Sequence, residues 1–120
     1  MKNFARLMSL LLGLVAASTL WAHAFLEHAQ PAVGSTVHAA PTRVELRFSE
    51  QLEPAFSTLR VVDRDGKAVD RHDKSVPDGD RTRMAISLTP LRPGKYRVIW
   101  RAVSLDTHVT EGDFVFELAP

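Results

Sequence analysis

The sequence contains no cysteine, and it has no clear excess of either charge, with 15 Lys and Arg residues against 14 Asp and Glu. Without cysteine the chain can form neither a disulfide framework nor a thiolate metal site. A nearly neutral composition argues against a nucleic-acid-binding protein, which usually carries a marked basic excess. The chain also lacks the Gly-x-Ser-x-Gly motif and any glycine-rich phosphate loop. Serine, histidine and aspartate are present, but their spacing indicates no catalytic triad, so we expect a protein that is not an enzyme.

The chain also has no apolar run long enough to span a membrane, which needs about 20 residues. Its longest apolar run extends from Leu7 to Ala17, with Ser9 and Gly13 as the only interruptions. Basic residues precede this run and small residues follow it, which is typical of a secretory signal peptide. We therefore predict a signal peptide at residues 1–22 and one exported domain at residues 23–120, with no membrane insertion.

Loss of residues 1–22 changes the charge of the chain. Two basic residues and no acidic residue lie in that segment, so the mature chain has 13 basic and 14 acidic side chains and a net charge of about −1. All five histidines stay in the mature chain. A domain of this size without disulfides depends on its own hydrophobic core or on a bound ligand.

Two cleavage points fit the end of the signal. The small residues of Ala22-His23-Ala24 favour cleavage after Ala24, whereas the weaker match Leu20-Trp21-Ala22 favours cleavage after Ala22. Only cleavage after Ala22 makes His23 the first residue, with a free α-amine next to its imidazole. The motif alone leaves both cleavage points open.

The mature chain shows the two-residue apolar alternation of β-strands and no sustained helical period. The strand-like runs are residues 43–48, 59–62, 67–69, 83–88, 96–103 and 113–118. Six prolines fall between these runs, where they do not interrupt strand pairing. Six or seven short strands in 98 residues predict an all-β antiparallel sandwich of the immunoglobulin-like kind. We expect Met84, Tyr96 and Trp100 in its core, and residues 70–83 as a solvated loop.

The segment Ser104-Leu105-Asp106-Thr107-His108 contains possible metal ligands. In an extended segment residues two apart lie on the same side, so Asp106 and His108 can converge. The same pattern is also typical of a polar corner in which Asp106 bonds nearby backbone N–H groups. If His23 is the first residue, its amine and Nδ1 can chelate one ion together with His108 and Asp106. Three nitrogens and one carboxylate oxygen form the tetragonal set that Cu(II) prefers.

Glu50 follows a predicted strand and is a further candidate, either as an axial ligand or as a hydrogen-bond partner of a ligand. An exposed carboxylate without a metal role is the alternative for this residue. The other histidines, His28, His38 and His72, are expected at the surface.

Three blocks of the sequence resemble the periplasmic copper-resistance protein CopC family: residues 23–37, 44–50 and 94–114. The resemblance implies a seven-stranded, cupredoxin-like Greek-key sandwich in the periplasm that binds Cu(II). It implies His23, Asp106 and His108 as metal ligands, often with Glu50, and therefore cleavage after Ala22. It also implies transfer of copper to a CopD-type inner-membrane protein, and we expect the chain to be a monomer.

The chain departs from those family members that bind Cu(I) through a methionine-rich loop, because Met84 is the only methionine left after removal of the signal. Thioethers and thiolates are the ligands that Cu(I) selects, so we predict one Cu(II) ion and no Cu(I) site.

Two other functions compete with that of a Cu(II)-binding protein. The fold alone also permits a metal-free adhesion or assembly module. A histidine-brace copper monooxygenase is disfavoured, because Asp106 would fill the equatorial position that oxygen needs.

Overall fold

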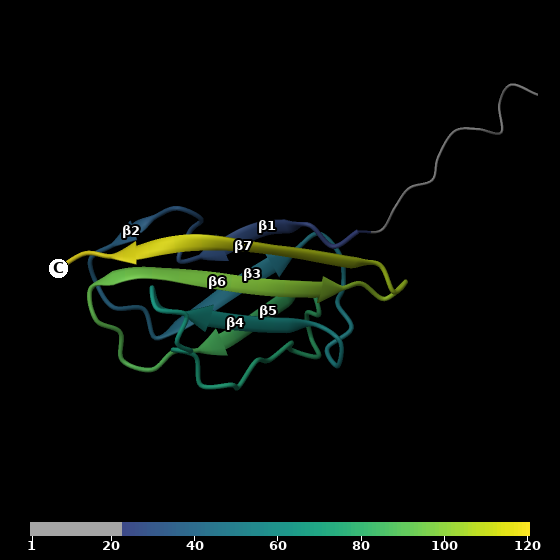
Figure 1. Cartoon of the computed structure of the whole chain (residues 1–120). Helices are drawn as coiled ribbons and strands as arrows, with labels where there is room; N and C mark the ends of the chain where they lie inside the picture. Colours follow the sequence, from purple (N-terminus) through teal and green to yellow (C-terminus); the bar gives the residue numbers. More distant parts are fainter. Residues whose placement is uncertain (1–22) are drawn as a thin grey trace, which may run out of the picture.

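The computed structural model describes residues 23–120, which form seven strands and no helix. The strands are β1 (Leu26–Gln30), β2 (Thr36–Val37), β3 (Arg43–Phe48), β4 (Thr58–Val62), β5 (Arg83–Ser87), β6 (Gly94–Val103) and β7 (Val109–Leu118). They build two facing layers (Figure 1). Within this part of the chain no helix is long and apolar enough to cross a membrane. The expected signal peptide, residues 1–22, lies outside the described residues.

The two sheets have the orders β1-β3-β5 and β2-β7-β6-β4. From β1 to β6, consecutive strands lie alternately in one sheet and then the other, and only β6 and β7 are neighbours both in sequence and in a sheet. All pairs are antiparallel except β2 with β7, which are parallel. The predicted seven-stranded sandwich is therefore confirmed, with one short parallel pair at its edge.

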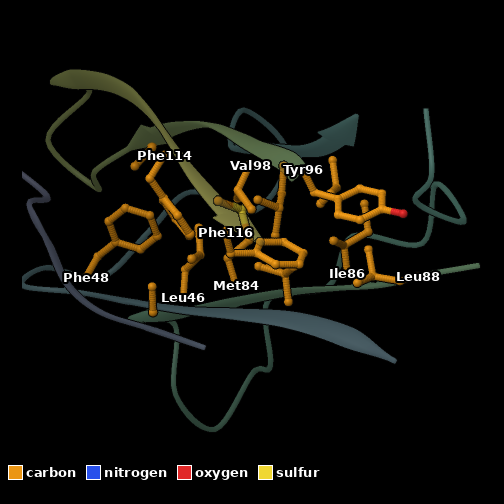
Figure 2. Packing of buried hydrophobic residues seen from close by; sticks show 14 of the residues in the cluster. Leu46, Phe48, Met84, Ile86, Leu88, Tyr96, Val98, Phe114 and Phe116 are labelled. Atoms are coloured by element: carbon orange, nitrogen blue, oxygen red, sulfur yellow. The ribbon is translucent and has the colours of Figure 1, made fainter. Parts of the chain in front are cut away.

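The core lies between the sheets and is built from the inward residues of each alternating strand. In β3, for example, Val44, Leu46 and Phe48 are buried while the residues between them are exposed. Figure 2 shows aliphatic and aromatic side chains of both sheets meeting in this layer. Met84 is fully buried there, and the Tyr96 ring stacks on Phe116 with centroids 5.5 Å apart. The core positions expected for Met84 and Tyr96 are thus confirmed, and Trp100 packs against the same core.

Two strands were not among the predicted runs, and one predicted run is not a strand. The regular alternation fails in β1 because its pairing with β3 is irregular between Leu26 and His28, and β2 has only two residues. These are the features that periodicity cannot detect. Residues 67–69 form only an isolated bridge between Val62 and Ala68.

The segment from residue 70 to 83 is not a wholly solvated loop, because Asp70 at its start is 4% exposed. Its carboxylate accepts hydrogen bonds from the Val61 N–H at 2.9 Å, Arg60 Nε at 3.1 Å and the His72 N–H at 3.0 Å. Burial acts to raise the pKa of Asp70, but the bonds from Val61, Arg60 and His72 outweigh it and lower the pKa. Asp70 therefore fastens this segment to β4 as a buried carboxylate.

Candidate metal centre

The turn between β6 and β7 carries Asp106 and His108. The two strands pair from Gly94–Leu118 to Val103–Val109, so the intervening residues, 104–108, must reverse the chain. The Ser104 N–H donates to the His108 carbonyl at 3.0 Å, and the Thr107 N–H donates to the Ser104 carbonyl at 2.9 Å. Thr107 has φ of 71°, in the left-handed region. The segment is therefore a tight turn rather than the extended segment that we expected.

Within this turn Asp106 and His108 nevertheless converge. His108 Nδ1 lies 2.9 Å from Asp106 Oδ2, while the Ser104 hydroxyl donates to Asp106 Oδ1. The hydrogen bond from Ser104, followed by that from His108, lowers the pKa of Asp106 to about 2. Asp106 is therefore an ionised carboxylate at neutral pH.

The first described residues are held against the same end of the sandwich, opposite the C-terminus (Figure 1). Ser49, which follows β3, donates its N–H to the Phe25 carbonyl at 2.8 Å and its hydroxyl to the His23 carbonyl at 3.1 Å. On the other side, the Thr110 hydroxyl donates to the Ala24 carbonyl at 2.6 Å. Ala24 itself is fully buried. These contacts fix the backbone of residues 23–25 between β3 and β7.

As a result, His23 lies beside His108. The centroids of the two imidazole rings are 4.8 Å apart, and the ring planes are inclined by 53°. The exposed Phe25 ring also lies near His23, with centroids 5.9 Å apart. The structure therefore brings together three of the four predicted ligands, pairing His23 with His108 and His108 with Asp106.

These separations can be compared with those of ligands on one ion. Two donors each about 2 Å from a metal and at about 90° to one another are about 2.8 Å apart. The 2.9 Å between His108 Nδ1 and Asp106 Oδ2 is close to that value. Two imidazoles bound side by side have centroids roughly 4.5 Å apart, near the 4.8 Å between His23 and His108. Even so, no group of three or more His, Cys, Asp or Glu residues within 23–120 is arranged to hold a metal ion. Side-chain movements would be needed to assemble such a group.

Glu50 is exposed. It directly follows Ser49, which holds the His23 carbonyl. Its role as a ligand or as a hydrogen-bond partner stays a prediction. His28, His38 and His72 are exposed, as the sequence indicated.

Three hydroxyl residues that position the site were not predicted. Ser104 stands two residues before Asp106, a spacing typical of local side-chain hydrogen bonds, so a signal for it was present. Ser49 and Thr110 gave no such signal, because their partners His23 and Ala24 are far away in the sequence.

Fold and site together define a small β-sandwich with two imidazoles and one carboxylate at one end. Residue 23 contributes one imidazole, and the turn between β6 and β7 contributes the other imidazole and the carboxylate. The chain belongs to the CopC domain family, whose model matches residues 26–119. Members of this family are copper-binding proteins and not enzymes. A copper-related function and the absence of catalysis, both expected from the sequence, follow from this membership.

Individual relatives are similar over most of their length. Copper resistance protein C of Pseudomonas syringae pv. tomato is 36% identical over 112 residues, which cover 88% of each chain. The crystal structure of CopC from Methylosinus trichosporium OB3b matches with a TM-score of 0.76 and 33% identity, covering 82% of this chain and 95% of that one. The structure of PcoC, a methionine-rich copper resistance protein from Escherichia coli, matches with a TM-score of 0.69 and 35% identity, covering 81% and 99%.

Proposed function

We propose that this protein is a monomeric periplasmic carrier that binds one Cu(II) ion after residues 1–22 are removed. The α-amine and Nδ1 of His23, an imidazole nitrogen of His108 and a carboxylate oxygen of Asp106 would hold the ion. The observation that carries this proposal is the proximity of three side chains. The ring centroids of His23 and His108 are 4.8 Å apart, and His108 Nδ1 lies 2.9 Å from Asp106 Oδ2.

The chemistry of these donors favours Cu(II). Imidazole, amine and carboxylate groups suit Cu(II) in a tetragonal arrangement, and ionised Asp106 contributes a negative charge without having to lose a proton. An α-amine has an ordinary pKa of about 7.7–8.0 and must lose its proton to bind, so the affinity should fall as the pH falls. Glu50 would supply an axial oxygen or a hydrogen bond to a ligand.

A separate Cu(I) site is not part of the proposal. Met84 is fully buried in the core, so its thioether is not offered at the surface. Cu(I) prefers thioether and thiolate ligands, and the mature chain has no other methionine and no cysteine. In this respect the chain differs from PcoC, which is described as methionine-rich.

The proposed role is to bind copper outside the cytoplasm and to transfer it to a CopD-type inner-membrane protein. Relatives named copper resistance protein C support a role in copper handling. The side chains of His108 and Asp106 are 38% and 42% exposed, which supports transfer, because an acceptor can approach them without unfolding the core.

The test is a Cu(II) titration of exported protein whose intact mass shows that His23 is its first residue. Electron paramagnetic resonance reports the ligands, and the fluorescence of Trp100, the single tryptophan of the mature chain, gives the stoichiometry. We expect one equivalent with a nitrogen-rich tetragonal signal. The variant His108→Ala and a chain with one extra residue before His23 should both lose that signal.

The matched control is His38→Ala, which removes an exposed histidine outside the group and should bind copper like the parent chain. Weak or heterogeneous binding by the parent chain, with His23 confirmed as its first residue, would contradict the proposal and favour a metal-free module.

A further inference from the structure

The outer face of the three-stranded sheet carries a row of basic side chains. His28 of β1 pairs with Arg47 of β3, and Arg47 pairs with Arg83 of β5, so the three residues stand side by side across the sheet. All three are exposed. With strands about 4.8 Å apart, the row extends about 10 Å across the sheet.

Such a row is not expected from the composition. The mature chain has a slight acidic excess, so the row is a local concentration of basic groups. Like charges directly opposite one another on neighbouring strands are destabilising. Arg83 is partly balanced by Asp80 at 2.9 Å, but none of the ion pairs within residues 23–120 includes Arg47. The charge at Arg47 is therefore available to an external anion.

The row forms part of a groove of about 520 Å³. Ser75 and Pro77 line it together with the strands, and Ser75 pairs with Ala85 of β5 through two backbone hydrogen bonds of 2.8 and 2.9 Å. Arg43 and Glu45 also line the groove, but they form an ion pair with each other at 3.0 Å. The uncompensated positive charge is thus concentrated at Arg47, which is paired with His28 across the sheet.

The groove is close to the candidate metal centre along the chain. Arg47 stands two residues before Ser49, which holds the His23 carbonyl, and His28 follows His23 by five residues. A molecule seated on the row would therefore lie beside the end of the sandwich at which copper would be bound.

We propose that this groove docks an acidic segment of the protein that accepts copper from this chain, an inference that rests on the proposed carrier function. Arginine forms paired hydrogen bonds with carboxylates, which suits the side chains of Asp and Glu. One carboxylate cannot reach across a row of about 10 Å, whereas two or three carboxylates of an acidic segment can. Docking there would hold the acceptor beside the copper-binding end while the ion moves.

The experiment measures binding of a fluorescein-labelled, acetylated hexaglutamate peptide to the exported protein by fluorescence anisotropy at low salt. The test variant is R47Q/R83Q. The matched control is R64Q/R97Q, which makes the same change of charge at the four-stranded sheet and the turn that follows β4. Because exposed ion pairs each make a modest contribution to binding, the test variant should bind about tenfold more weakly and the control less than about twofold. The variant R47K/R83K keeps the charge but loses the paired hydrogen bonds, so its affinity should lie between those of the parent chain and R47Q/R83Q.

Three results would overturn the proposal: no binding of hexaglutamate by the parent chain, an equal loss in the test and control variants, or displacement of the peptide by propanedioate at the same carboxylate concentration. The last result would identify a site for small anions instead. A Cu(II) titration of R47Q/R83Q separates this inference from the carrier function, because that variant keeps every proposed ligand and should bind one equivalent. Failure of peptide binding with normal copper binding would refute the docking groove alone.

Discussion

Gly112 is the position at which the packing of the sandwich gives the sharpest prediction. It faces Trp100 across the β6–β7 pair, and a Cβ at residue 112 would lie 2.4 Å from Cζ2 and 2.8 Å from Cε2 of the indole. Trp100 in turn packs edge-on against the buried Phe48, with ring centroids 5.2 Å apart. A methyl group at residue 112 therefore displaces the indole and disturbs its packing against Phe48.

The expected cost of Gly112→Ala follows from these contacts. Overpacking costs about 1–3 kcal/mol, and loss of the aromatic pair adds about 0.5–1.5 kcal/mol. Replacing glycine restricts the unfolded chain, which offsets about 0.4–1 kcal/mol. Because Trp100 is only partly buried, it can move outward and relieve part of the overlap. We expect a net loss of about 1–2 kcal/mol in the free energy of unfolding.

The assay is urea unfolding followed by far-ultraviolet circular dichroism, with Gly79→Ala as the control. A Cβ at Gly79 would meet nothing within 4 Å, and this glycine has no positive φ, so the control should keep its stability or gain up to about 1 kcal/mol. Tryptophan fluorescence should shift in Gly112→Ala only. If both variants unfold at the same urea concentration, the reasoning about Trp100 is wrong.

The other predictions concern the buried carboxylate, the turn and the core methionine. Asp70→Ala leaves the Val61 N–H without its acceptor and should cost about 1–3 kcal/mol in urea unfolding, whereas Asp113→Ala at an exposed ion pair should cost less than about 1 kcal/mol. Because folding lowers the pKa of Asp70, its contribution to stability is present at neutral pH and is lost as the pH falls below the ordinary carboxyl range. The difference in the free energy of unfolding between the parent chain and Asp70→Ala should therefore shrink in acid. A difference that stays constant with pH would contradict this assignment. Ser104→Ala removes the main hydrogen bond that lowers the pKa of Asp106, so a carboxyl titration by nuclear magnetic resonance should show that pKa rising from about 2, whereas Ser35→Ala should leave it unchanged. Met84→Leu should change the free energy of unfolding by less than about 1.5 kcal/mol and leave Cu(II) binding intact. The parent chain should form no tight Cu(I) complex in competition with bathocuproine, and such a complex would refute the absence of a Cu(I) site.

Much of the sandwich could be predicted from local alternation, because each long strand has one face in the core and one in solvent. The pattern of Val44, Leu46 and Phe48 is an example. It failed for β1, where the pairing with β3 is irregular, and for β2, which is too short to show a period. The burial of Asp70 also escaped prediction, since its partners on β4 are set by the tertiary fold and not by neighbouring residues.

The candidate site was predictable only in part. The spacing of Asp106 and His108 indicated that they converge, but the backbone achieves this through a turn with a positive φ at Thr107. No spacing rule connects His23 with His108. Donor chemistry indicated that the two residues could share an ion, and the resemblance to the family supplied the cleavage point that this requires. The hydroxyl groups of Ser49 and Thr110, which hold the first residues in place, depend on contacts between distant parts of the chain.

The order of the strands also has a consequence for how the protein folds. Because consecutive strands alternate between the sheets up to β6, most pairings join distant parts of the chain, and such topologies fold slowly. The β6–β7 hairpin is the exception, and closure of its five-residue loop needs little loss of chain entropy. Asp106 and His108 can therefore meet early in folding. His23 reaches them only when the first strand docks, since the bond between Thr110 and Ala24 spans 86 positions. A copper ion that needs all three residues would then bind the finished sandwich and no earlier form, and it would stabilise that state alone.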